Sequence, residues 1–137
     1  MTRPLGPLVG LLAVWVSILP VATFAQGTTV SIQPFTNLTG DPRDSWIGAG
    51  IAETLASDLQ GPGFEVVLGD QMVATRVVRG AYQRLGDQIR ITARLVDVST
   101  GVVIRGATID GVMRDLFDLQ DRLTKELSEP AAPSTPT

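Results

Sequence analysis

The sequence of 137 residues contains neither cysteine nor histidine, and its single lysine is Lys125. The usual nitrogen and sulfur ligands of zinc are therefore missing, and no Cys–His or Ser–His–Asp catalytic set can form. Disulfide bonds are excluded as well. Most hydrolase mechanisms are thereby removed, while carboxylate-based chemistry stays open. Because no nucleophile and base can be paired, the sequence predicts a protein that is not an enzyme. No cofactor or metal is expected.

Basic residues are also scarce: 11 Lys and Arg stand against 14 Asp and Glu, for a net charge of −3. Aromatic residues make up only 5% of the chain. Nucleic-acid binding needs positive charge and favours stacking aromatics, so no nucleic-acid partner is expected. Hydrophobic residues reach 44%, which is enough to build the core of one domain.

The first 25 residues have the pattern of an export signal. Arg3 is the only charge before Asp41, residues 5–21 are mostly apolar, and small residues precede Gln26. We predict cleavage after Ala25, which would place the protein in the periplasm or outside the cell. An uncleaved anchor is the alternative, and it would be the only membrane contact. No cysteine follows the segment, so the protein is not expected to be a lipoprotein.

At the other end, residues 129–137 contain three prolines and no apolar residue larger than alanine. Such a segment cannot continue a helix or bury a side chain, so a disordered tail is expected. Residues 26–128 remain for a single domain.

Hydrophobic periodicity predicts two amphipathic helices and five strands in this domain. Ile47, Ile51, Leu55 and Leu59 form the stripe of the first helix, and Ile89, Ile91, Ala93 and Leu95 share one face of a strand. The strands are expected at 29–35, 64–68, 75–84, 88–98 and 102–110, and the helices at 46–60 and 112–127. The order β-α-β-β-β-β-α predicts an α+β or α/β two-layer fold. It has a mixed sheet of about five strands, with both helices packed on one face.

Three clusters invite a functional interpretation. Gly40, Gly48 and Gly50 suggest a phosphate-binding loop, but small residues that let a helix approach a sheet explain them better. Asp41, Asp44 and Glu53 suggest a cation site, but turn and capping roles explain the aspartates, with Asp44 or Ser45 as the helix cap. The arginines of the last three strands suggest either a basic stripe for an anionic partner or a solvated face paired with Asp97 and Asp110. They are Arg79, Arg84, Arg90, Arg94 and Arg105.

Three blocks of the sequence resemble the TolB amino-terminal-like domain family, which is also known from FlgO and, more distantly, CsgG. They are Ile32–Pro42, Gly86–Asp97 and Asp115–Asp121, together with Trp46, Gly50, Ile51 and Glu53. The chain departs from the family between its second and third strands, where residues 69–74 are too few for the usual helix.

The resemblance implies a non-enzymatic domain of the bacterial envelope that binds another envelope protein or assembles with itself. A small-ligand or anion sensor that uses the loop from Asn37 to Asp44 is the alternative. Trp46 is expected to be structural, packed over the loop or the sheet edge and buried there. The shortened connection is expected to expose Val66, Val67, Val77 and Val78 as an association surface. The candidate interaction residues are Asn37, Thr39, Gly40, Asp41, Trp46, Val77, Val78, Arg90 and Arg94.

Overall fold

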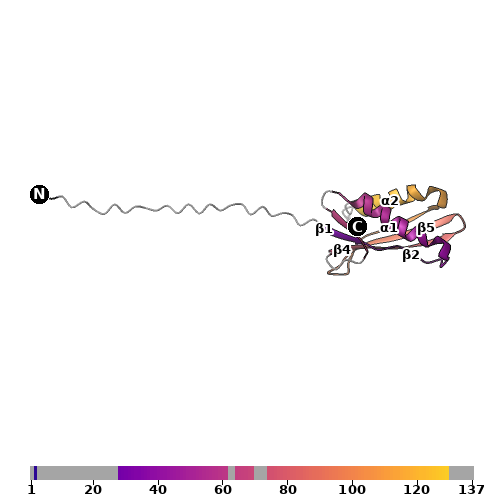
Figure 1. Cartoon of the computed structure of the whole chain (residues 1–137), viewed down its shortest axis with the longest axis horizontal. Helices are drawn as coiled ribbons and strands as arrows, with labels where there is room; N and C mark the ends of the chain where they lie inside the picture. Colours follow the sequence, from indigo (N-terminus) through magenta and orange to yellow (C-terminus); the bar gives the residue numbers. More distant parts are fainter. Residues whose placement is uncertain (1, 3–27, 62–63, 70–73, 130–137) are drawn as a thin grey trace, which may run out of the picture.

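The computed structural model describes residues 2, 28–61, 64–69 and 74–129 (Figure 1). The predicted cleavage site and residues 130–137 of the predicted tail lie outside these residues, as does most of the short connection at 69–74. In the described part of the chain, no helix is both long and apolar enough to cross a membrane.

One mixed sheet forms the first layer of the domain. Its strand order is β3-β1-β4-β5-β6, and the short β2 pairs with β4. β1 lies parallel to both β3 and β4, whereas β4, β5 and β6 form an antiparallel meander. The strands are β1 (Thr28–Ile32), β2 (Thr36–Asn37), β3 (Phe64–Leu68), β4 (Arg76–Leu85), β5 (Gln88–Asp97) and β6 (Val103–Val112).

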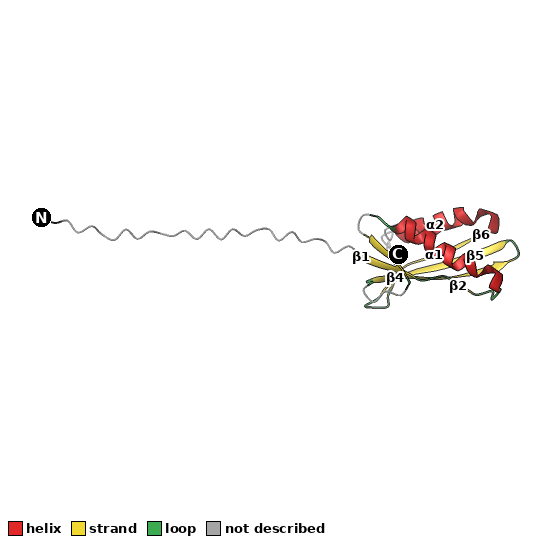
Figure 2. Cartoon of the chain, in the orientation of Figure 1, coloured by secondary structure: helices red, strands yellow, loops and turns green. Residues whose placement is uncertain are grey.

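Two helices, α1 (Ser45–Leu59) and α2 (Leu116–Ser128), cover one face of this sheet (Figure 2). Each follows a 3-10 turn, η1 (Pro42–Asp44) and η2 (Met113–Asp115), so the second helix begins a few residues later than predicted. Ile51, Leu55 and Leu123 are each 0% exposed, and burying such a side chain stabilises the fold by about 2 kcal/mol. The predicted two-layer fold class is confirmed.

The predicted first strand, 29–35, is divided into two short strands. β1 ends at Ile32, and β2 begins at Thr36. Between them Pro34 has no N–H to donate to a ladder, and Phe35 is buried at 4% exposure instead of continuing the alternation. Within the described residues, the sheet therefore has six strands rather than about five.

Phe35 explains two of the glycines. A Cβ atom on Gly80 would lie 2.2 Å from the Phe35 ring, and one on Gly48 would lie 2.1 Å from the Phe35 carbonyl oxygen. Close approach therefore requires glycine at Gly48, as the sequence suggested. Gly50 differs, because a Cβ atom there would meet nothing within 4 Å.

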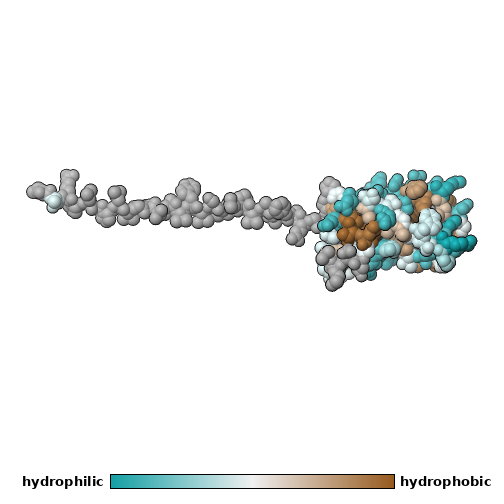
Figure 3. All heavy atoms as spheres, in the orientation of Figure 1, coloured by the Kyte–Doolittle hydropathy of each residue, from teal (hydrophilic) through white to brown (hydrophobic). Residues whose placement is uncertain are grey.

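The expected exposed valine surface is wrong. Val78 is 0% exposed and Val66 packs against the same core, because both point to the helix-covered face with Val30 and Ile32. Val77 points to the opposite face but is only 7% exposed, beside Ser31 in the register. Val67 is half-buried. Among the exposed large apolar side chains, Phe64 and Leu68 lie at the ends of β3, and others lie far from these valines, among them Leu38, Trp46, Leu85 and Phe117. Figure 3 shows separate apolar areas with hydrophilic surface between them.

Candidate interaction site

The loop before α1 is folded by the side chain of Asn37. Its Oδ1 accepts hydrogen bonds from the backbone N–H groups of Thr39 at 3.0 Å and Gly40 at 3.1 Å, and its Nδ2 donates to the Asp41 carbonyl oxygen at 2.8 Å. Gly40 has φ = +82°, a conformation that favours glycine. A phosphate-binding loop needs free backbone N–H groups, and here Asn37 occupies those of Thr39 and Gly40. The loop is therefore a self-contained turn.

Thr39 connects this turn to the end of β4. The Thr39 hydroxyl accepts a hydrogen bond from the Arg84 N–H at 2.8 Å and donates one to the Arg84 carbonyl oxygen at 3.2 Å. The Leu38 N–H donates to the Tyr82 carbonyl oxygen at 2.9 Å. The hydrogen bonding between β2 and β4 thus continues into the loop as far as Thr39. These bonds hold the start of α1 against the sheet.

Asp44 is the point where helix, loop and sheet meet. Its Oδ1 lies 2.6 Å from Nη1 of Arg84, whose Nε donates to the Gly86 carbonyl oxygen at 2.9 Å. The Tyr82 hydroxyl donates to the Asp44 carbonyl oxygen at 2.5 Å. Burial raises the pKa of Tyr82 above its usual value of 10.0, and the nearby Asp44 charge adds to this effect. Asp44 therefore binds the sheet and, contrary to prediction, makes no side-chain capping hydrogen bond.

Asp41 provides the cap that was expected from Asp44 or Ser45. Its Oδ1 accepts from the Arg43 N–H at 3.0 Å, and its Oδ2 lies 2.8 Å from Nη2 of Arg43. The hydrogen bond from the Arg43 side chain holds the pKa of the Asp41 carboxyl below its usual value of 3.8. The cap thus lies at the start of η1, one turn before α1.

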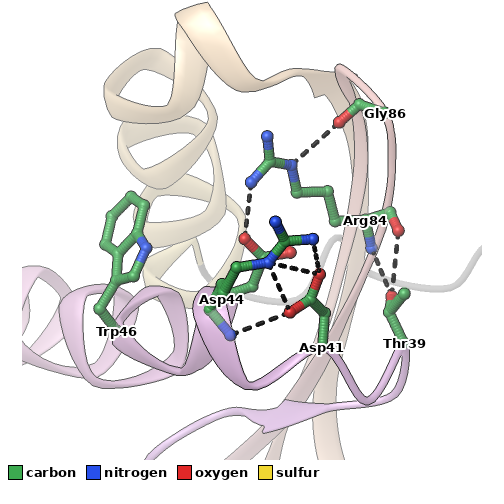
Figure 4. A pocket seen from close by; sticks show the side chains of 7 residues that line it. Thr39, Asp41, Asp44, Trp46, Arg84 and Gly86 are labelled. Carbon is green, nitrogen blue, oxygen red and sulfur yellow. Dashed lines mark hydrogen bonds and ion pairs between the residues drawn. The ribbon is translucent and has the colours of Figure 1, made fainter.

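These residues surround an open hollow of about 450 Å³ at the start of α1 (Figure 4). Arg43 and Arg84 are each paired with an aspartate, so the four charges cancel. Trp46 is 57% exposed and stands apart from the ion pairs (Figure 4), so the expectation that it is buried is wrong. It precedes the inward-facing Ile47 by one residue and therefore points away from the core. The lining residues are Thr39, Asp41, Arg43, Asp44, Trp46, Arg84 and Gly86.

The hollow offers an aromatic contact surface rather than a charged binding site. Two of the three carboxylates suggested for a cation, Asp41 and Asp44, each pair with an arginine. In the described residues, no group of three Asp or Glu side chains is arranged to hold a metal.

The outer face of the sheet, which neither helix covers, holds Arg79, Arg90 and Arg94. Arg105 lies on the inner face instead, where its Nε donates to the Glu126 carbonyl oxygen of α2 at 3.2 Å. Arg90 and Asp110 form an ion pair at 2.6 Å across β5 and β6, which confirms the predicted partner and holds the pKa of Asp110 below 3.8. Asp97 instead accepts hydrogen bonds from Ser99 and Thr100 in the following turn. Arg94 lies directly opposite Arg79 in the β4–β5 register.

The candidate residues therefore divide into three places. Asn37, Thr39, Gly40, Asp41 and Trp46 lie at the loop and hollow. Arg90 and Arg94 lie on the outer sheet face, and Val77 and Val78 are buried. Sequence reasoning missed the Asp44–Arg84 pair, although Arg84 shares the inward alternation of Val78 and Tyr82 along β4.

Comparisons with known proteins agree with the fold. The chain is 26% identical to PelC from Paraburkholderia phytofirmans, which was solved as a dodecamer; the match covers 77% of this chain and 90% of that chain, with a TM-score of 0.54. TolB from Acinetobacter baumannii has a TM-score of 0.54 at 13% identity, over 74% of this chain and 27% of TolB. About a quarter of TolB thus shares the fold of this chain, as the resemblance implied.

Comparison by sequence shows a relative of which this chain spans only a small part. The chain is 26% identical over 117 residues to a Rhizobium meliloti (strain 1021) protein named as an adenylate cyclase, a match over 72% of this chain. The chain spans only 20% of the length of that relative. No protein-family model matches the chain. Membership of the TolB amino-terminal-like family therefore stays a prediction.

Proposed function

We propose that the protein is exported to the bacterial cell envelope and works there by protein–protein association, with itself or with another envelope protein, and not by catalysis. The predicted signal over residues 1–25 supports the location. The likeness to PelC, solved as a dodecamer, supports association.

The observation that carries the proposal is the one-sided construction of the domain. α1 and α2 both pack on one face, while the outer face of β4, β5 and β6 has no helix over it in the described part of the chain. Its exposed residues include Arg94, Thr108 and Asp110. An antiparallel sheet tolerates water on one face, but such a face is also a ready surface for a partner.

Crosslinking in the intact envelope tests this proposal. A photo-reactive residue at Thr108, on the outer face, should give adducts of defined mass in cells that export the protein. The same residue at Thr100, which is exposed in the β5–β6 turn, is the matched control and should give few. Equal labelling from both positions, or none from Thr108, would contradict association through the sheet.

The alternative function, a small-ligand sensor, is favoured by one observation, the hollow of about 450 Å³ beside the exposed Trp46. Its charges are already paired, so an uncharged ligand that stacks on the indole fits it better than an anion. Melting of the protein with and without candidate neutral ligands separates the two functions. A ligand-dependent rise that Trp46→Ala abolishes would favour the sensor.

A further inference from the structure

Two arginines face each other on the outer side of the sheet. Arg79 of β4 and Arg94 of β5 are direct register partners, and both are exposed. Like charges in this position destabilise a sheet. In the described residues, neither guanidinium lies within the 4.0 Å ion-pair distance of a carboxylate. Folding alone gives no reason for this pair, and guanidinium groups bind carboxylates through strong, often bidentate hydrogen bonds.

The surface beside the pair is open and nearly flat. Gly106 lies opposite Arg94 on β6, and a Cβ atom there would meet only the Ala93 carbonyl oxygen, at 3.9 Å. The next row across the sheet is Ala81, Thr92 and Thr108, which are all small. An element of another molecule can therefore approach the arginine pair without being blocked by long side chains.

The helix layer carries the opposite charge. α1 contains two acidic residues and no basic residue. The Thr54 hydroxyl donates to Oε1 of Gln120 at 3.3 Å, so the helices lie side by side at this level. Glu53 precedes Thr54, and Asp121 follows Gln120, with Asp118 one turn earlier. These three exposed carboxylates, Glu53, Asp118 and Asp121, are called the acidic helix surface below.

We propose that the arginine pair of one copy binds the acidic helix surface of a second copy. This inference rests on the proposed function and specifies its partner and contact. Side chains three residues apart on a helix have Cβ atoms about 5–6 Å apart, and directly opposed residues in a sheet are separated by about 5 Å. Asp118 and Asp121 therefore match the spacing of the arginine pair.

The proposed contact joins two different surfaces, so a pair of copies keeps one free arginine pair and one free acidic helix surface. Such a heterologous contact repeats from copy to copy and forms a ring if the rotation closes, or a filament if it does not. The charges also set the orientation, because two sheet faces or two helix layers would repel each other. Beyond Asp121, Arg122 and Lys125 make the second half of α2 less acidic, which confines the contact to the first half.

Charge reversal on each surface provides the test. The sheet variant carries Arg79→Glu and Arg94→Glu, and the helix variant carries Asp118→Lys and Asp121→Lys. Both variants are expressed from the full-length sequence. They are purified in the form that the cell produces after any cleavage of the export signal. Each should associate more weakly than wild type by on the order of 100-fold in sedimentation velocity, because like charges then meet. Arg114→Glu with Lys125→Glu, at positions 85% and 76% exposed and outside the proposed contact, matches the charge of the sheet variant and should assemble normally.

Mixing the two variants is the decisive step. The glutamates of the sheet variant match the lysines of the helix variant, and the two unchanged surfaces match each other, so an equimolar mixture should regain assembly. Arg79→Gln with Arg94→Gln removes the repulsion and guards against misfolding; it should melt no lower than wild type and still fail to assemble. If wild type assembles and the sheet variant assembles equally well, or if the mixture stays dissociated, this contact is wrong while association stands. A wild type that never associates overturns both self-association and this contact.

Discussion

The hydroxyl of Tyr82, in the middle of the sheet, donates to the backbone carbonyl of Asp44 at 2.5 Å, directly before α1 begins. Tyr82 is 1% exposed, so the bond is protected from water. The Asp44 side chain meanwhile binds Arg84, two residues further along the same strand. Tyr82 thus positions the start of α1. Arg84, the next residue on the inward face of β4, holds the loop that leads into this helix.

Breaking the Asp44–Arg84 pair should destabilise the fold. Arg84→Met keeps the length of the side chain but leaves the Asp44 carboxylate, 11% exposed, without its charged partner. We expect a loss of about 2 kcal/mol in the free energy of unfolding measured with urea. Arg43→Met is the control at an ion pair whose arginine is 89% exposed, and it should leave the unfolding curve nearly unchanged. Equal effects of the two substitutions would contradict this assignment.

Gly48 and Gly50 form a matched pair in one helix. Gly48→Ala would place a methyl group 2.1 Å from the Phe35 carbonyl oxygen and should cost about 3 kcal/mol or more. Gly50→Ala meets nothing within 4 Å and removes a flexible residue from a helix, so it should stabilise the protein by about 1 kcal/mol. Thermal melts of both variants check the difference in sign.

Trp46 should contribute little to stability. It is 57% exposed, so Trp46→Ala should change the free energy of unfolding by less than about 1 kcal/mol. Ile47→Ala, at the next residue and 0% exposed, should cost about 3 kcal/mol. Chemical unfolding of the two variants is the measurement. A large loss from Trp46→Ala would mean that the indole is packed after all.

The pKa of the Asp97 carboxyl should lie below its usual value of 3.8. The hydrogen bond from the Ser99 side chain is the main cause of its lowered pKa. Because the folded value is depressed, the stabilising contribution is complete above the unfolded value of about 3.8 and is lost as the pH falls through the folded value. Ser99→Ala should raise the Asp97 pKa toward 3.8, as followed by carboxyl NMR shifts. The Asp110 pKa, lowered by Arg90, should not move in that variant.

Periodicity was enough to predict most of the fold. The alternation of Ile89, Ile91, Ala93 and Leu95 identified the inner face of β5, and the stripe through Ile47 identified that of α1, because burial imposes these periods directly. The split between β1 and β2 was not predicted, because it depends on how Phe35 packs against Gly80. A strand pattern does not encode that contact.

The site was less accessible to sequence reasoning. Arg84 was grouped with the other arginines of the last three strands, as part of either a basic stripe or a solvated face. Its position in the alternation places it on the inner face beside Tyr82. The burial of Trp46 was inferred from its place beside the loop and not from the helical repeat, which directs its side chain away from the core. The opposition of Arg79 and Arg94 depends on the strand register, which the turn at Gly86 fixes and which was not worked out from the sequence.

The central claim is that this one-sided domain works by association. Sedimentation velocity of the purified wild-type protein over a range of micromolar concentrations tests it most directly, repeated at high salt. If the domain associates through charged surfaces, we expect species larger than the monomer that dissociate as salt screens the charges. A folded protein that stays monomeric at every concentration, and that gives no adducts from Thr108 in the envelope, would contradict it.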